Sequence, residues 1–219
     1  MKDRFDSRLL LVVHIGSWAR NDENENSDID VNVILDKVMP EDIVVYRKIV
    51  DGMLDKQLAC GFLDGLNEIK LWSRYDLIGF YYGCKVLYGN VAEVIGEISR
   101  KDIYDNAMIT GSGINHAIRH ALIYNEINTD TADAMKGLYK AAFYIIQVWY
   151  LLKYGVYIAK RDEMIEKTDC AEDKLILNKY KHWNENKQKT EENPVQTLEL
   201  LERWSSGMFD RLDEIHNSF

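Results

Sequence analysis

Hydrophobic and polar positions fall into two different patterns within the first 35 residues. Residues 9–15 (LLLVVHI) form an apolar run whose length and β-branched content favour a buried strand over a helix. Residues 28–35 (DIDVNVIL) instead alternate polar and apolar side chains, which is typical of a strand with two different faces. The polar segment between them, residues 20–27, carries three asparagines and predicts a turn or short loop.

The polar side chains of the second predicted strand share one face. Asp28, Asp30 and Asn32 point one way, while the apolar residues between them point the other. Two carboxylates with this spacing lie roughly 6.5–7 Å apart at the backbone, so their oxygens can converge on divalent cations. Hard oxygen ligands suit magnesium, which is usually shared with substrate phosphates.

Gly16 and Ser17 directly follow the first predicted strand. A glycine at this point lets the backbone come close to a ligand. If a helix begins near Ser17, its free backbone N–H groups would face an anion such as phosphate. His14 could also touch a phosphate, although a packed strand residue is the commoner role for such a histidine.

The next segments predict a helix and further strands. Pro40 opens a helix over residues 40–53, because proline is preferred at the first helical position. Residues 56–63 predict a third strand, and Asp64-Gly65 is a hairpin-type turn signal. Residues 68–72 alternate and are compatible with a fourth strand.

After residue 89 the pattern changes to helical spacing and strands disappear. We place a domain boundary near residues 90–110, dividing the chain into residues 1–100 and 101–219. Predicted helices cover residues 113–128, 130–154, 171–184 and 194–215, with a short charged loop at 187–193.

Composition narrows the possible functions. An apolar content of 47% over 219 residues is enough for one or two domains with a real core. The net charge of −9, without a basic run, argues against the phosphate contacts that nucleic acid needs. The three cysteines (Cys60, Cys84 and Cys170) form no C-x-x-C pair and indicate reduced thiols. No apolar run reaches transmembrane length, and no signal-peptide pattern is present, so we expect a cytoplasmic protein with no membrane partner.

The first strand ends in Gly16-Ser17, and ten residues (18–27) separate this pair from Asp28-Ile29-Asp30 on the second strand. Gly16-Ser17 and Ser27-Asp28-Ile29-Asp30, in this strand context, resemble the two-part signature of the nucleotidyltransferase superfamily that includes DNA polymerase beta. The resemblance implies an α+β fold. A nucleotidyltransferase catalytic domain, with a small mixed sheet and flanking helices, would be followed by an all-α helical-bundle domain that binds substrate.

The same resemblance implies the reaction. A nucleoside triphosphate, with ATP expected, would bind with magnesium, two ions in this family, and pass its nucleoside monophosphate to an acceptor hydroxyl with release of pyrophosphate. Asp28 and Asp30 would be the catalytic metal ligands. Gly16, Ser17 and Ser27 would hold the nucleotide.

Members of this family carry a third acidic residue on a neighbouring strand. Glu68 and Asp64 are the candidates in this chain. We assign Glu68 as the third catalytic and metal-binding carboxylate, because it begins the alternating segment, whereas Asp64 precedes a glycine and reads as a turn residue. The family usually has an aspartate in a more apolar strand, and this chain departs from that pattern.

The second half resembles the helical C-terminal domain of kanamycin-, aminoglycoside- and lincosamide-type antibiotic nucleotidyltransferases. The similarity rests on Lys140-Ala141-Ala142-Phe143 within a long helix and on residues 154–160, where Ala159 replaces the usual serine or threonine. The resemblance implies that Lys140, or Lys136, reaches the triphosphate. It also implies a small, hydroxyl-bearing, antibiotic-like acceptor that enters between the domains, and hence a role in antibiotic resistance. A cationic acceptor would suit this acidic chain.

Two other functions stay open. The chain could be a nucleotidyltransferase-type antitoxin that modifies a protein partner; Arg211 and His216 even form an R-x4-H pattern of the kind seen in such nuclease partners. It could also be a nucleotide-binding homologue without activity. Monomer and homodimer are both compatible with the sequence.

Overall fold

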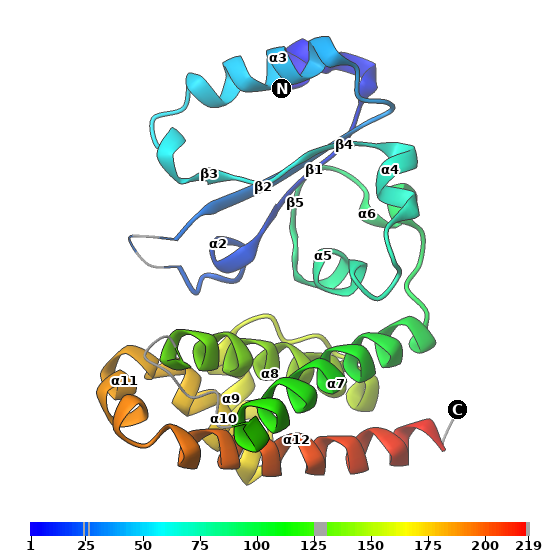
Figure 1. The fold of residues 1–219 in the computed structure, drawn as a ribbon. Coiled ribbons are helices and arrows are strands. Elements are labelled where there is room, and N and C mark those ends of the chain that lie inside the picture. Colours follow the sequence, from blue (N-terminus) through cyan, green and yellow to red (C-terminus); the bar gives the residue numbers. More distant parts are fainter. Residues whose placement is uncertain (24, 26, 125–130, 218–219) are drawn as a thin grey trace. The chain divides into compact units, whose positions relative to one another are not determined.

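The computed structural model describes residues 1–23, 25, 27–124 and 131–217, which form two compact units, Met1–Ser99 and Arg100–Phe219. The first unit is a mixed sheet with helices, and the second is helical (Figure 1). The predicted α+β fold is confirmed. The roles of the two units as catalytic and substrate-binding domains stay predictions. Within the described ranges, no helix is long and apolar enough to cross a membrane.

The sheet is built around its first two strands. β1 pairs antiparallel with both β2 and β5, whereas β3 and β4 run parallel to β2, giving the order β3-β2-β1-β5 with β4 also on β2. The strands are β1 Leu9–Ile15, β2 Ile29–Leu35, β3 Ala59–Cys60, β4 Leu63–Gly65 and β5 Lys85–Gly89.

Helices cover both faces of this sheet (Figure 1). On one face, Leu11, Val13 and Ile34 pack against residues of α4, α5 and α6. On the other face, Val12 and Val33 pack against α3 and the N-terminal segment. The helices of this unit are α1 Lys2–Phe5, α2 Gly16–Arg20, α3 Pro40–Asp51, α4 Leu66–Leu71, α5 Leu77–Gly83 and α6 Val91–Ile95, with 3-10 turns η1 Asp6–Arg8 and η2 Lys56–Leu58.

The structure confirms the strands at residues 9–15 and 28–35 and the helix that Pro40 opens. Two later predictions are wrong. Asp64 belongs to β4 and leads into a helix, so Asp64-Gly65 is not a hairpin turn. Residues 68–72 are not a strand, because α4 covers Leu66–Leu71 and its Leu71 is 87% exposed.

The second unit packs α7, α8 and α12 against one another, with α10 against α8 and α12. Predicted helices at 130–154 and 194–215 correspond to α8 and α12; residues 125–128 and 130 of the predicted helices lie outside the described residues. The predicted loop at 187–193 is wrong, because α11 continues to Glu192 and buries Trp183 and Thr190. The helices are α7 Arg100–Tyr124, α8 Thr131–Tyr154, α9 Arg161–Lys167, α10 Ala171–Lys181, α11 Trp183–Glu192 and α12 Pro194–His216.

Candidate active site

Gly16 and Asp30 meet at the end of the β1–β2 pair. Ile15, the last residue of β1, lies opposite Asp30 in β2. A Cβ atom on Gly16 would stand 2.1 Å from Oδ2 of Asp30, and Gly16 has a left-handed φ of 75°. Only glycine fits here without displacing the carboxylate. The two halves of the sequence signature therefore lie together at one end of the sheet.

The segment that joins the two halves is held by Trp18, which the sequence did not single out. Its indole Nε1 donates a hydrogen bond of 3.2 Å to the backbone oxygen of Ser27, directly before Asp28. Arg20 and Asp22 form an ion pair of 3.8 Å in the same segment. The Trp18 hydrogen bond thus joins α2 to the residue before Asp28, and the ion pair lies at the end of α2. Asn24 and Asn26 of the predicted loop lie outside the described residues.

The polar residues at the start of β2 differ in exposure. Asp28 directly precedes the strand and is exposed, whereas Asp30 is half-buried. Asn32 is fully buried, and its Oδ1 accepts a hydrogen bond of 3.2 Å from the backbone N–H of Phe62. Asn32 thus connects β2 to the adjacent segment between β3 and β4. The carboxylates of Asp28 and Asp30 stay accessible to solvent and ligands.

His14 lies on the opposite face from Asp30. It pairs with Val31 in β2 and Lys85 in β5, and side chains alternate along each strand. Burial lowers the pKa of His14, and the charge of Lys85 adds to this effect, while Asp30 and Glu23 oppose it. A neutral, partly buried imidazole on this face fits the packed-residue interpretation of His14.

The strand beside Asp30 lacks a carboxylate at the adjacent position. Parallel pairing places Cys60 of β3 opposite Asp30, and the Cys60 side chain is exposed. Asp64 of β4 is opposite Ile34. Ile34 comes four residues after Asp30 in β2, so the two positions are roughly 13 Å apart along the strand. Burial and, secondarily, the charge of Glu68 raise the pKa of Asp64.

The structure does not bring Glu68 to the two aspartates. Its Oε2 accepts a hydrogen bond of 2.5 Å from the backbone N–H of Gly65, the residue that precedes α4. Gly65 pairs with Leu35 at the far end of β2, roughly 16 Å from Asp30. The glutamate is therefore a helix cap, because it satisfies a backbone donor at the start of α4.

The acidic pair still fits a magnesium ion that arrives with a triphosphate. Two carboxylates and shared phosphate oxygens are a usual ligand set for magnesium, which keeps part of its water shell. Among the residues that the structure describes, no group of three or more His, Cys, Asp or Glu side chains could hold a metal. A site with three protein carboxylates is thus not present in the described part of the chain.

The predicted triphosphate lysines belong to the second unit. Lys140 is exposed on α8, and Lys136, one turn earlier, donates a hydrogen bond of 3.2 Å to Asn184. A role for Lys140 at the triphosphate stays a prediction. Arg211 of the R-x4-H pattern has a structural partner, because its guanidinium donates two hydrogen bonds of 2.8 Å to buried Asp173.

Comparison with solved structures supports the predicted fold. The crystal structure of spectinomycin adenyltransferase AAD(9) from Enterococcus faecialis with ATP and spectinomycin matches with a TM-score of 0.54 over 96% of this chain and 94% of that chain. The two sequences are 16% identical, so the match establishes the fold alone. The predicted resemblance to an antibiotic-modifying nucleotidyltransferase is confirmed at that level. No protein-family model and no curated protein matches the chain.

Proposed function

We propose that the protein is a magnesium-dependent nucleotidyltransferase that passes a nucleoside monophosphate from a triphosphate, ATP in the first instance, to a hydroxyl of a small acceptor. The observation that carries the proposal is the contact between Gly16 and Asp30, where the Asp30 carboxylate occupies the space that a side chain on residue 16 would fill. The Gly-Ser turn and the D-x-D strand form one site in this way, on a fold shared with an enzyme whose structure holds ATP.

Each residue of the site has a distinct proposed role. The backbone at Gly16 and Ser17 and the hydroxyl of Ser17 bind phosphate oxygens, as backbone donors beside a glycine turn can. Asp28 and Asp30 hold magnesium, which when bound neutralises charge on the phosphates. Trp18 is a positioning residue, because its hydrogen bond to Ser27 fixes the start of the aspartate strand. Lys140 remains our candidate for a further triphosphate contact.

The acceptor proposed is a small hydroxyl-bearing compound of the antibiotic class. The structurally similar adenyltransferase is named for spectinomycin, and its structure contains that compound. The net charge of −9 suits a cationic acceptor better than a polyanion. Spectinomycin and aminoglycosides are therefore the first acceptors to test.

One observation favours a second candidate function, nucleotide binding without transfer. Cys60 is opposite Asp30 on the neighbouring strand, and Glu68 caps a helix at the other end of the sheet. A site without a third carboxylate lacks one group that could accept the proton of an acceptor hydroxyl as a general base. Binding of the nucleotide itself does not require that group.

The two functions separate in one experiment. ATP labelled on its α-phosphate is incubated with the protein, magnesium and a panel containing spectinomycin and aminoglycosides. Nucleotidyl transfer predicts a labelled acceptor and one pyrophosphate for each acceptor modified. Magnesium-dependent ATP binding without pyrophosphate release from any acceptor would favour the second candidate. No ATP binding at millimolar magnesium would contradict both.

A further inference from the structure

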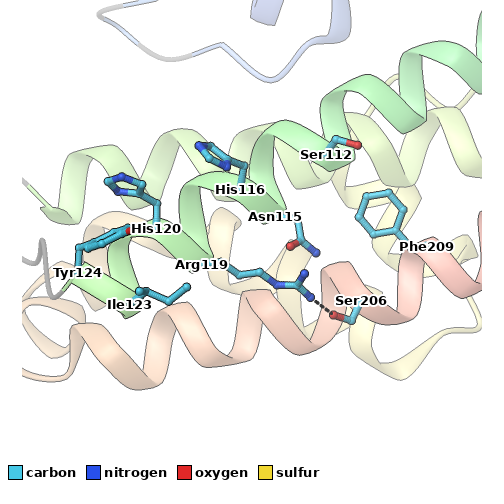
Figure 2. Close-up of a pocket in the computed structure, with 9 residues that line it drawn as sticks. All are labelled: Ser112, Asn115, His116, Arg119, His120, Ile123, Tyr124, Ser206 and Phe209. Carbon is cyan, nitrogen blue, oxygen red and sulfur yellow. Dashed lines mark hydrogen bonds between the residues drawn. The ribbon is translucent and has the colours of Figure 1, made fainter.

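Two of the five histidines lie one turn apart on α7. His116 and His120 have the spacing that places side chains on the same face of a helix. Their ring centroids are 5.9 Å apart, and the ring of Tyr124 lies 4.7 Å from that of His120. Figure 2 shows both imidazoles projecting from the same side of the helix.

These imidazoles line a surface pocket of about 670 Å³ formed by residues of α7 and α12. Ser112, His116, His120 and Tyr124 succeed one another at intervals of four residues and all line it. The row therefore sets a hydroxyl one turn before the two imidazoles and a phenol one turn after them. Of these four groups, the two imidazoles are adjacent, one turn apart, and carry nitrogen atoms that can share one bound ion.

The charge beside the pair is balanced. Arg119 also lines the pocket, but its guanidinium donates hydrogen bonds of 3.3 and 3.0 Å to Oε1 of Glu202. It donates a further one of 3.4 Å to Ser206, which Figure 2 shows as a dashed line. An arginine paired with a carboxylate repels an approaching cation less than an unpaired one would.

The ring separation is close to that of a chelating pair. Two imidazoles that bind one tetrahedral zinc ion through nitrogens at about 2.1 Å have ring centroids roughly 5 Å apart. The observed 5.9 Å closes to that value with a small rotation of the exposed His116 side chain, a motion of the ps–ns kind. The helix backbone need not move.

We propose that His116 and His120 form a binding site for one divalent transition-metal ion such as zinc, nickel or copper. Imidazole nitrogen favours these ions, whereas magnesium prefers oxygen, so the site differs in chemistry from the Asp28–Asp30 pair. Since the described chain offers no cluster of three ligating side chains, the protein supplies two ligands. Water or a small molecule in the pocket completes the coordination.

The test is a calorimetric titration of zinc into the untagged full chain, with millimolar magnesium present to saturate the carboxylates. One ion should bind per chain. His116→Ala or His120→Ala should each weaken binding by about 100-fold, the lower end of the gain from a second tethered ligand. His182→Ala, at the start of α11, and Cys60→Ser, an exposed thiol, are the controls and should bind zinc as the unchanged protein does.

Copper-induced line broadening in NMR spectra identifies the ligands independently of affinity. The imidazole signals of His116 and His120 should broaden at a lower copper concentration than those of His14, His182 and His216. Equal broadening of all five would overturn the proposal. So would unchanged zinc affinity in the His116→Ala/His120→Ala double variant, with circular dichroism verifying that its helices are intact.

Discussion

At the level of residues, the glycine at position 16 allows the carboxylate of Asp30 to lie against the backbone. Oδ2 of Asp30 lies 2.1 Å from where a Gly16 Cβ would be, a distance at which the two atoms would overlap, so the carboxylate lies directly against the turn that follows β1. The resemblance to a two-part family signature implied that the two would lie together, and the structure shows how: Gly16 directly follows β1, Asp30 lies in β2, and these adjacent antiparallel strands are joined by one short segment. Local connections of this kind are the part of a site that sequence patterns describe best.

Replacement of Asp30 by asparagine tests the role of this carboxylate. We expect Asp30→Asn to reduce nucleotidyl transfer by at least about 100-fold, or about 2.7 kcal/mol of barrier, because the metal loses a charged ligand at the phosphoryl centre. The measurement is pyrophosphate release at saturating magnesium. Asp64→Asn is the matched control, since Asp64 is opposite Ile34 rather than Asp30 and should leave the rate near that of the unchanged protein.

Glu68 should matter for stability and not for the nucleotide. Glu68→Ala removes the acceptor of the Gly65 N–H at the start of α4, and we expect a loss of roughly 1 kcal/mol in the free energy of unfolding. Urea denaturation measures this loss, and ATP affinity should be unchanged. A large fall in ATP affinity with unaltered stability would return Glu68 to the metal site.

The misassignment of Glu68 has a physical cause. The segment from Gly65 to Leu71 carries two signals, an alternation that suits a strand and a Glu three residues after a cap position that suits a helix start. Packing decides between them, because Ile69 enters the core while Leu71 stays in solvent. A six-residue helix is too short for its periodicity to be read from the sequence. Trp18 was missed because its hydrogen bond to a backbone oxygen leaves no motif.

At the level of elements, one ion pair joins the 3-10 turn η1, directly before β1, to α3. Arg8 donates hydrogen bonds of 2.8 and 2.9 Å to the two carboxylate oxygens of Asp42, which also accepts from the backbone N–H of Met39. The Arg8 hydrogen bond is the main reason that the pKa of Asp42 is lowered. Asp42 is buried at the first turn of the helix that covers one sheet face.

This pair predicts a pH dependence with a definite sign. A carboxyl whose folded-state pKa lies below its unfolded value stabilises the fold above the unfolded pKa, about 4, and loses that contribution as pH falls through the folded pKa. The difference in unfolding free energy between the unchanged protein and Asp42→Asn should thus be constant above about pH 5 and shrink toward pH 3. A difference that grows on acidification would contradict the pairing.

Asp173 plays a comparable role among the helices of the second unit. It is fully buried in α10, binds Arg211 of α12 through two hydrogen bonds and accepts a third, of 2.8 Å, from Trp204. We expect Asp173→Asn to cost about 3–5 kcal/mol of stability, because it leaves the Arg211 charge without its partner. Asp162→Asn, which breaks an exposed pair with Lys181, is the control and should cost under about 1 kcal/mol.

Helix predictions in the second unit succeeded where the apolar pattern was long. The stripes of α8 and α12 run over many turns, so their existence was clear from the sequence. α11 was missed because charged and amide residues dominate it, and only Trp183 and Thr190 are buried. Its ion pair between Lys187 and Asp133 of α8 is a tertiary contact that the sequence does not reveal.

At the scale of the whole molecule, fold and function rest on different observations. The sheet unit and the helical unit together match the adenyltransferase fold over nearly the full length of both chains. The proposed function rests on a few residues at one end of the sheet, where Gly16 and Asp30 meet and Cys60 lies opposite Asp30 on β3. The fold could be predicted from two motifs and helical periodicity, whereas the missing third carboxylate required the register of β3 on β2.

A crystal structure with magnesium and a non-hydrolysable ATP analogue tests the central claim most directly. The account predicts phosphate oxygens on the backbone and hydroxyl of Gly16 and Ser17, and magnesium bound by Asp28 and Asp30, with Glu68 still on the Gly65 N–H. A nucleotide bound elsewhere, or a metal held by Glu68 or Asp64 in place of Asp30, would contradict it.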